Sequence, residues 1–302
     1  MQSFRIVVFS IAILFSSLSL LLLALPSPSV PEFSYGQLDN IAHQGGNLEC
    51  PDATFVAFDV AVKLNVDVLE MDVHLSKDGH LMVIHDKRID RTTNGVGAIR
   101  ELTLAQIQQF DAAYWWPYHS NQDVEKQNVP DATTFPFRGK GVTIPTLNEM
   151  FQRYPDHRFV IELKDDTEEL RSALLDMIDQ YDRWRHVLIA SFYQPTLQEV
   201  RKIEPRAQTY AAGSEIRLFY ILHKLHLEKL FPYDIDALAV PMTSGGLNLA
   251  TQQFVDAAHN AGMLVHYWTI NNADDMTALM EIGADGLMTD YPSVLKSLPY
   301  GR

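Results

Sequence analysis

Eight short apolar runs recur along this chain, and most are separated by stretches with the periodicity of amphipathic helices. Such runs predict β-strands, and helices between successive strands predict parallel β/α units. Eight units are the number that closes a β/α barrel. With 302 residues, of which 47% are hydrophobic, the chain can build one large α/β domain. The predicted strands span Asn40–His43, Val68–Val73, Phe159–Leu163, Val187–Ser191, Gln208–Ala211, Ala237–Pro241, Leu264–Thr269 and Gly286–Thr289, and the predicted helices span Thr54–Leu64, Glu168–Tyr181, Gln194–Ile203, Ile216–Leu230, Thr251–Ala261 and Ala273–Ile282.

The connection between the second and third predicted strands is too long for a simple β/α loop. Leu81–Ile84 is predicted to pair with the preceding strand in a hairpin turned at Asp78-Gly79, and Glu101–Phe110 is predicted as a short helix. Asn121–Lys140 is polar and rich in turn residues. We therefore interpret residues 86–146 as a small insertion over the end of the barrel where loops commonly carry function.

The N-terminal 30 residues differ from the rest, because Ile6–Leu25 is apolar apart from four serines. As a helix this run would span about 30 Å, close to the thickness of a bilayer core. We expect residues 1–30 to be a transmembrane anchor or a signal segment removed on export, 31–38 a linker, and 39–302 one barrel domain. Arg5 precedes the run, which favours a barrel on the non-cytoplasmic (periplasmic or extracytoplasmic) side of a membrane. Cleavage would instead give a secreted protein.

The net charge limits the possible partners, and the cysteine count limits how the fold is stabilised. The formal net charge of −14 speaks against nucleic acid as a partner, because phosphate backbones attract basic surfaces. It does not exclude a small anionic substrate, which a bound divalent cation would attract locally. Cys50 is the only cysteine, so no intrachain disulfide can form and core packing must stabilise the fold.

Acidic side chains occur on two of the predicted strands. Alternation along Val68–Val73 turns Glu70 and Asp72 to the same side, which we predict to be the barrel interior. The third strand repeats the pattern with Glu162 and Lys164. Buried carboxylates at close range repel one another unless a cation compensates, and three oxygen donors suit a hard ion such as Mg²⁺ or Ca²⁺. The alternative is a set of internal salt bridges, for instance between Glu162 and Lys164.

Two histidines follow predicted strands near these acids. His43 ends the first strand and is followed by Gln44, Gly45 and Gly46, whose glycines allow backbone amides to approach an anion. His85 ends the hairpin strand. Imidazoles can remove a proton from one oxygen and deliver a proton to another near neutral pH, although a single histidine at a strand end is more often structural. Together with the carboxylates, the pair predicts acid–base cleavage of a phosphate ester.

These motifs resemble those of the glycerophosphodiester phosphodiesterase family, from about Asn40 to Pro292. The family's His-Arg-Gly, Pro-Glu-Asn-Thr, Glu-x-Asp, His-Asp and Glu-x-Lys elements are similar to His43-Gln44-Gly45, Pro51-Asp52-Ala53-Thr54, Glu70-Met71-Asp72, His85-Asp86 and Glu162-Leu163-Lys164. Later elements resemble Trp268-Thr269-Ile270-Asn271 and Gly283-Ala284-Asp285-Gly286-Leu287-Met288-Thr289-Asp290-Tyr291-Pro292. Each motif alone is weak, but their order and spacing together are specific.

The resemblance implies a TIM (β/α)8 barrel with one divalent cation, Ca²⁺ or Mg²⁺. It implies that Glu70, Asp72 and Glu162 hold the metal and that His43 and His85 form the acid–base pair. It also implies that Lys164 contacts phosphate and that Trp268 packs against the glycerol or the head group. For Trp268, ordinary barrel core is the alternative.

The chain departs from the family pattern at two places. Gln44 stands where the family usually has arginine, a phosphate ligand, and we expect Gln44 to bind phosphate more weakly because glutamine lacks the charged fork of arginine. Asp52 replaces glutamate and Ala53 replaces asparagine in the second motif. Neither departure removes a predicted metal ligand or acid–base residue, so activity is still expected.

The predicted function is metal-dependent hydrolysis of small glycerophosphodiesters to glycerol 3-phosphate and an alcohol. An alternative is lysophospholipase D activity on lysophospholipids, motivated by the apolar N-terminal run and by Tyr114-Trp115-Trp116-Pro117. Those aromatic residues could equally form local core. A third hypothesis is a membrane-tethered binding module that has lost catalysis.

Overall fold

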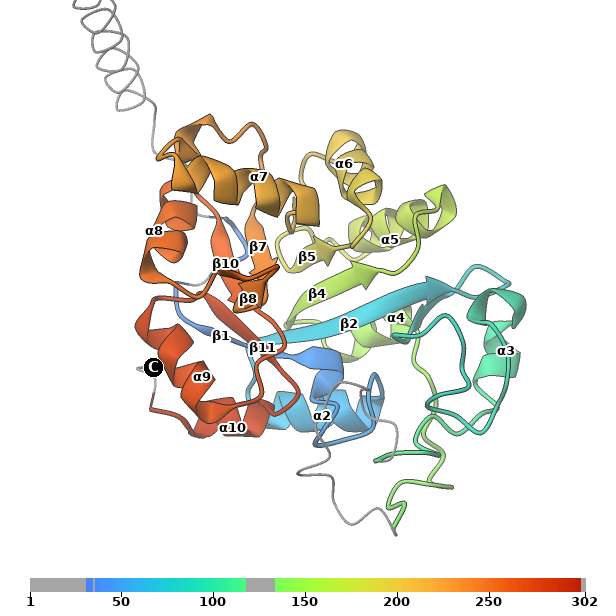
Figure 1. Cartoon of the computed structure of the whole chain (residues 1–302). Helices are drawn as coiled ribbons and strands as arrows, with labels where there is room; N and C mark the ends of the chain where they lie inside the picture. The colour runs from blue at the N-terminus through green and yellow to red at the C-terminus, as the bar shows by residue number, and fades with distance from the viewer. Residues whose placement is uncertain (1–30, 35, 118–133, 300–302) are drawn as a thin grey trace, which may run out of the picture.

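The predicted TIM barrel is confirmed by the computed structural model, which describes residues 31–34, 36–117 and 134–299 (Figure 1). Within these residues eight parallel strands follow one another around the barrel in the order β6, β5, β4, β2, β1, β11, β10 and β7. A parallel bridge between Tyr210 and Ala237 joins the two ends of this series. The barrel strands are β1 (Asp39–Ala42), β2 (Val68–Leu75), β4 (Arg158–Leu163), β5 (Val187–Ala190), β6 (Gln208–Thr209), β7 (Ala237–Val240), β10 (Leu264–Tyr267) and β11 (Gly286–Thr289).

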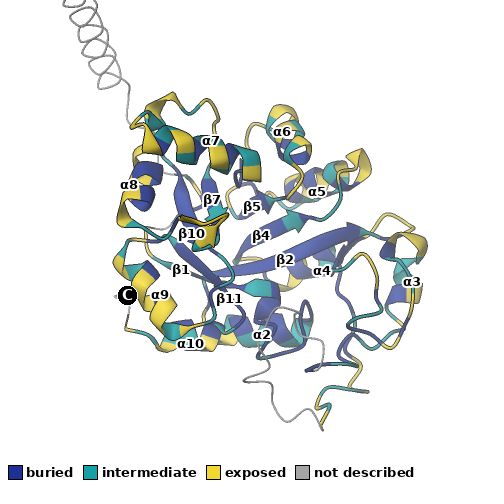
Figure 2. Ribbon diagram, viewed as in Figure 1, coloured by how far each residue is buried: buried dark blue, intermediate teal, exposed yellow. Residues whose placement is uncertain are grey.

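Helices surround the strands, with their apolar sides buried and their outer sides exposed (Figure 2). All six predicted helices are present. Their ends differ from the prediction by at most three residues, except that α7 ends at Lys224, six residues before its predicted end. Helices α4 and α10 were not predicted, although Thr146 and Glu149 form a capping box that marks the start of α4. The helices are α2 (Phe55–Lys63), α4 (Leu147–Arg153), α5 (Glu168–Gln180), α6 (Gln194–Ile203), α7 (Gly213–Lys224), α8 (Gln252–Asn260), α9 (Ala273–Glu281) and α10 (Pro292–Ser297).

Alternation along the strands divides the apolar core into layers. On β2, Leu69 and Met71 pack in the cluster between strands and helices, together with Phe58 of α2. Val68 on the same strand packs inside the barrel with Val160 of β4. The predicted facing of this strand is therefore correct, because its apolar residues contact the helices and its acidic residues face the interior.

The connection after β2 has its own small core. Strand β3 (Leu81–Val83) pairs antiparallel with β2, which confirms the predicted hairpin. The predicted helix at Glu101–Phe110 is shorter than expected and consists of the 3₁₀ turn η2 (Ile99–Glu101) and α3 (Leu104–Ile107). The apolar side chains of this region form a cluster separate from the barrel core. Residues 118–133, which overlap the predicted polar segment, lie outside the described residues.

The segment before the barrel contributes to its base. Phe33, in the predicted linker, is fully buried and packs with Ile41 and Val68 inside the barrel. Its amide donates to Gln208 Oε1 at 2.7 Å, and Arg158 Nη1 donates to its carbonyl at 2.8 Å. The predicted anchor, residues 1–30, lies outside the described residues. In the part of the chain that is described, no helix is both long and apolar enough to cross a membrane.

Candidate active site

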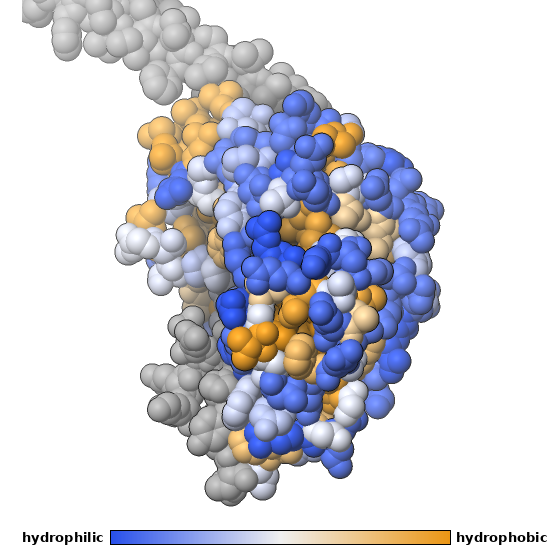
Figure 3. All heavy atoms as spheres, turned by 90° about the vertical axis from the view of Figure 1, so that its right-hand side faces the viewer, coloured by the Kyte–Doolittle hydropathy of each residue, from blue (hydrophilic) through white to orange (hydrophobic). Residues whose placement is uncertain are grey.

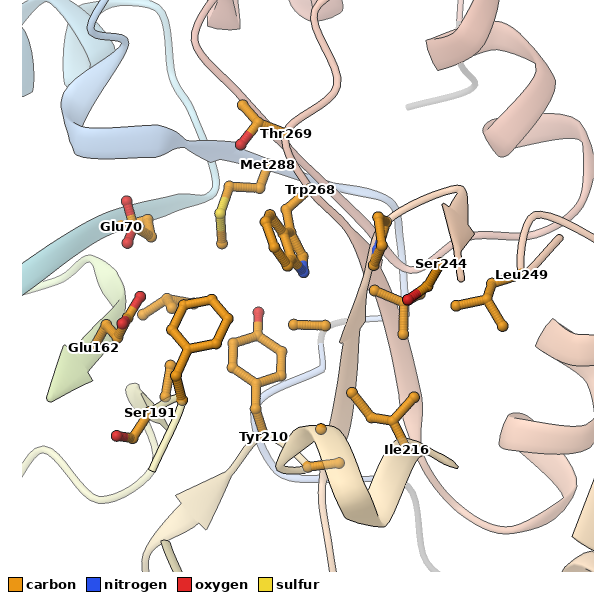
Figure 4. A pocket seen from close by; sticks show the side chains of 18 of the residues that line it. Glu70, Glu162, Ser191, Tyr210, Ile216, Ser244, Leu249, Trp268, Thr269 and Met288 are labelled. Atoms are coloured by element: carbon orange, nitrogen blue, oxygen red, sulfur yellow. The ribbon is translucent and has the colours of Figure 1, made fainter. Parts of the chain in front are cut away.

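A cavity of about 820 Å³ opens at the carboxyl ends of the barrel strands (Figure 4). The structure brings seven of the eight predicted site residues together around this cavity. They are His43, Glu70, Asp72, His85, Glu162, Lys164 and Trp268. Gln44, the eighth, is buried beside the cavity and does not line it.

Lys164 lies between two of the three predicted metal ligands. Asp72 and Glu162 are partners in the register of β2 and β4, which places their side chains next to each other. Lys164 Nζ is 2.8 Å from Asp72 Oδ1 and 3.0 Å from Glu162 Oε1. The ion pair between Glu162 and Lys164, considered above as an alternative, therefore exists. Across residues 31–34, 36–117 and 134–299, no group of three His, Cys, Asp or Glu side chains is arranged to hold a metal ion.

Carboxyl groups nevertheless outnumber ammonium groups at this end of the cavity. Burial and the charge of Asp72 raise the pKa of Glu70 to about 8, and the same two causes raise the pKa of Glu162. Burial opposes the charge of Lys164, but Asp72 and Glu162 outweigh it and raise the pKa of the ammonium group. One ammonium thus neutralises only part of a three-carboxylate group, and the donor set would accept a further cation.

Gln44 forms hydrogen bonds to the acidic residues and is not part of the cavity surface. Its φ of 50° puts it in the left-handed region, which is uncommon for residues other than glycine. In this conformation its amide donates to Glu70 Oε2 at 2.9 Å. Its side-chain Nε2 donates to Asp72 Oδ2 at 3.2 Å. The side chain is buried and its amide is hydrogen-bonded to Asp72, and a contact of Gln44 with phosphate stays a prediction.

The imidazole of His43 is positioned by Asp290 and Asn271, which belong to the two motifs near the C-terminus. Its Nδ1 donates to Asp290 Oδ1 at 2.6 Å, and Asn271 Nδ2 donates to Asp290 Oδ2 at 2.7 Å. The imidazole Nε2 is then directed toward Glu70 Oε2, 3.9 Å away. Burial lowers the pKa of His43, but the charges of Glu70 and Asp290 outweigh burial and raise it to about 9.

His85 is held in the same way by its neighbour. Its Nδ1 donates to Asp86 Oδ1 at 2.7 Å, and this hydrogen bond raises the pKa of His85 against the effect of burial. Arg91 Nε donates to Asp86 Oδ2 at 2.6 Å, and Arg91 Nη1 lies 3.1 Å from the buried Asp52. Asp52, one of the departures from the family pattern, therefore takes part in the network that orients His85.

The sequence did not single out the residues that anchor the two imidazoles. Asp290 and Asn271 were noted only as members of motifs, and Arg91 only falls within the predicted insertion at residues 86–146. A carboxylate next to a histidine, as in His85-Asp86, is visible in the sequence. The contact between His43 and Asp290 spans 247 residues, and no local pattern could have predicted it.

Aromatic residues form the middle of the cavity. Phe192 and Trp268 meet edge to face with ring centroids 6.0 Å apart. Tyr210 points its hydroxyl into the cavity (Figure 4), where it is hydrogen-bonded to His266 Nδ1 at 2.6 Å. Burial lowers the pKa of His266 to about 4, so this imidazole is neutral. Tyr210 was not predicted as a site residue, because strand β6 is only two residues long and carries no motif.

The aromatic segment at residues 114–117 lies elsewhere. Trp116 is buried, its Nε1 donates to the carbonyl of Asn47 at 3.1 Å, and its ring packs edge to face on Phe137. Tyr114 packs on Trp115 and under the guanidinium of Arg138. This segment does not line the cavity, so the structure favours local packing over contact with an acyl chain.

The fold and this site define the class of the protein. Parallel strands form a barrel, and two anchored imidazoles face buried carboxylates at the carboxyl ends of those strands. Active sites of TIM-barrel enzymes lie at this end of the barrel. The arrangement is that of a TIM barrel with titratable side chains gathered at the end where enzymes of this fold have their active sites.

Comparison with known proteins defines the family. Residues 43–294 match the Glycerophosphoryl diester phosphodiesterase family, and the chain belongs to this family. It is 29% identical over 270 residues to a glycerophosphodiester phosphodiesterase of Bacillus subtilis, with 86% of each chain covered. It is 24% identical over 287 residues to a human lysophospholipase D, with 85% of this chain and 84% of the human protein covered.

The barrel is also similar to solved structures. A crystal structure of a glycerophosphoryl diester phosphodiesterase domain from Mycobacterium tuberculosis matches with a TM-score of 0.72 and 20% identity. The match covers 86% of this chain and 98% of that domain. The predicted fold, the family resemblance and the prediction of an enzyme of this family are confirmed. The roles predicted for individual residues stay predictions.

Proposed function

We propose that the chain hydrolyses glycerophosphodiesters to glycerol 3-phosphate and an alcohol by paired-histidine acid–base catalysis. The observation that carries this proposal is the matched anchoring of His43 and His85. In each imidazole a carboxylate accepts a hydrogen bond from Nδ1, so Nε2 is the ring atom left for acid–base chemistry in the cavity that both rings line. The Nε2 of His43 lies 3.4 Å from Gln44 Nε2. One ring can then remove a proton from the attacking hydroxyl while the other protonates the leaving alkoxide.

The other side chains bind and orient the phosphate. The Lys164 ammonium lies at the acidic end of the cavity and would supply positive charge to phosphoryl oxygens as negative charge develops. Trp268 offers an apolar wall against which the glycerol or the head group would pack. Overall, water supplies the oxygen that ends on phosphorus, and the bond between phosphorus and the alcohol oxygen breaks.

We further propose that Glu70, Asp72 and Glu162 hold one divalent cation, Ca²⁺ or Mg²⁺. The excess of carboxylates over ammonium groups at this end of the cavity supports it. A bound divalent cation polarises a phosphoryl oxygen and lowers the pKa of a hydroxyl that it binds. Lys164 now satisfies part of the charge that such an ion would neutralise.

A metal-dependent assay tests both proposals. The full-length chain is treated with chelator and incubated with glycerophosphocholine or glycerophosphoethanolamine, and the released alcohol and glycerol 3-phosphate are measured. We expect hydrolysis with Ca²⁺ or Mg²⁺ and its loss with chelator. Inactivity on every diester with every divalent ion would instead support a non-catalytic binding module. Undiminished activity in chelator would refute the metal proposal alone.

The location of the protein is a separate proposal. We propose that residues 1–30 anchor the chain in a membrane, with the barrel on the non-cytoplasmic side, supported by the apolar run Ile6–Leu25 and by Arg5 before it. Alkaline carbonate extraction of cell membranes, followed by protease treatment of intact spheroplasts, tests this. A chain found only in the soluble fraction without its first residues would indicate a cleaved signal segment.

A further inference from the structure

The cavity continues well beyond the acid–base site. Figure 4 shows Glu70 and Glu162 at one end and Ile216, Ser244 and Leu249 at the other, with the aromatic residues between them. The second end is built by α7 and by the hairpin of β8 (Thr243–Ser244) and β9 (Leu247–Asn248). We call this end the apolar arm. Its aliphatic side chains are Ile216, Ile221, Val240, Leu247 and Leu249, and Tyr220 adds an aromatic ring.

The chemistry of the apolar arm differs from that of the catalytic end. In the described part of the chain, the carboxylates that line the cavity are Glu70, Asp72 and Glu162, and all three lie at the catalytic end. A cationic head group would therefore find no counter-charge in the arm, whose polar lining residues are Arg217 of α7, Ser244 of β8 and the hydroxyl of Tyr220. A hydrocarbon chain would remove the apolar side chains from water, which is favourable in proportion to the area buried.

The arm also opens to solvent through apolar side chains. Ile221 and Leu247 line the cavity and are 55% and 43% exposed. Leu225, the residue directly after α7, is also exposed but does not line the cavity. Scattered exposed apolar residues are ordinary, but a group at the mouth of a cavity marks a binding surface. On one face of the molecule, hydrophobic atoms gather near the centre between hydrophilic borders (Figure 3).

We propose that the apolar arm binds the hydrocarbon chain of a lysophospholipid, a glycerophosphodiester that carries one acyl chain. The proposal rests on the proposed function, because it requires the phosphate to lie at the catalytic end. Water supplies the oxygen that ends on phosphorus, the bond from phosphorus to the head-group oxygen breaks, and the alcohol leaves with a proton. The acyl ester is untouched, so the second product is a monoacylglycerol phosphate.

A series of substrates with one head group tests the arm. Choline release by the full-length chain, held in amphipol, is measured with glycerophosphocholine and with its hexanoyl and octanoyl derivatives below their micelle concentrations. Each methylene buried in the arm should favour binding. We expect kcat/KM to rise with chain length, by at least about tenfold from the deacylated to the octanoyl substrate.

Two variants place the effect in the arm. Ile216→Glu puts a charge on the wall of the arm, and Leu247→Glu puts one at its exposed rim, where misfolding is not expected. Both should lower kcat/KM for the octanoyl substrate by about tenfold and change it for glycerophosphocholine by less than about twofold. Ile203→Glu is the matched control, because Ile203 is an exposed apolar residue outside the cavity, and it should change neither rate.

The outcomes separate the two proposals. A flat or falling dependence on chain length, with glycerophosphocholine still cleaved, would refute the acyl-binding arm and leave the phosphodiesterase intact. So would equal losses on both substrates in Leu247→Glu. If neither substrate is cleaved with any divalent ion, the proposed function itself fails. Octyl phosphate should inhibit the wild-type chain more strongly than Leu247→Glu, and equal inhibition of the two would also contradict the proposal.

Discussion

The two ends of the cavity are built from different parts of the barrel. The catalytic end comes from β1, β2, β3 and β4 and their immediate continuations, where most side chains are buried and held by several hydrogen bonds. The apolar arm comes largely from α7 and the β8–β9 hairpin, where Ile221 and Leu247 are exposed. Reacting groups need fixed positions, and strands of a closed barrel supply them. Connecting segments can change without disturbing the barrel, which suits them to substrate selection.

The largest effect should come from removing an imidazole at the catalytic end. His43→Ala and His85→Ala should each lower kcat by about 10²- to 10⁴-fold, because acid–base catalysis contributes that much. Steady-state rates on glycerophosphocholine give the measurement, and thermal unfolding verifies the fold. His80→Ala is the control, since His80 is exposed in the β2–β3 turn. Near-normal turnover in either site variant would remove that histidine from the mechanism.

The next largest effect should come from removing the ammonium group that partly neutralises the carboxylates of the catalytic end. Lys164→Met leaves Asp72 and Glu162 without their ammonium partner and should lower the free energy of unfolding by about 3 kcal/mol in chelator. Urea unfolding measures the loss, and Ca²⁺ or Mg²⁺ should reduce it. Lys87→Met, which breaks the exposed pair with Asp165, should cost less than about 1 kcal/mol. Equal losses in the two variants would mean that burial of the acidic group has little energetic consequence.

A smaller effect is expected from the anchor of His85. The Asp86 carboxylate raises the pKa of His85, so Asp86→Asn should lower that pKa. The limb of the kcat/KM pH profile that His85 controls should move to lower pH, whether the imidazole acts as acid or as base. We also expect kcat to fall by about tenfold, because asparagine cannot stabilise an imidazolium. An unshifted profile would assign Asp86 a purely structural role.

The smallest effect should be on the stability of the apolar arm. Ile221→Ala should change the free energy of unfolding by less than about 0.5 kcal/mol, because the side chain is 55% exposed. Leu188→Ala, inside the barrel, is the counterpart and should cost at least about 2 kcal/mol. Chemical denaturation of both variants compares them. A large loss for Ile221→Ala would show that the arm supports the fold rather than substrate choice.

Local patterns predicted the barrel and much of its catalytic end. Alternation along β2 correctly assigned Glu70 and Asp72 to the interior, because a strand has a strict period of two. Helices with a clear apolar stripe, such as α6 and α8, were predicted within a few residues. Helix α4 was missed inside the long interval after β2, although the capping box at Thr146 and Glu149 was present in the sequence.

What the sequence alone determined is the set of strands, the side of each strand that carries the acidic residues, and the family motifs. Tertiary structure decided which groups meet: Asp290 with His43, Arg91 between Asp52 and Asp86, and Lys164 between two acids. It also decided that α7 and the β8–β9 hairpin extend the cavity with an apolar arm. The physical reason is the sequence distance over which each kind of interaction acts. Strand and helix periodicities act over a few residues, whereas these contacts exist only because barrel closure brings distant segments together.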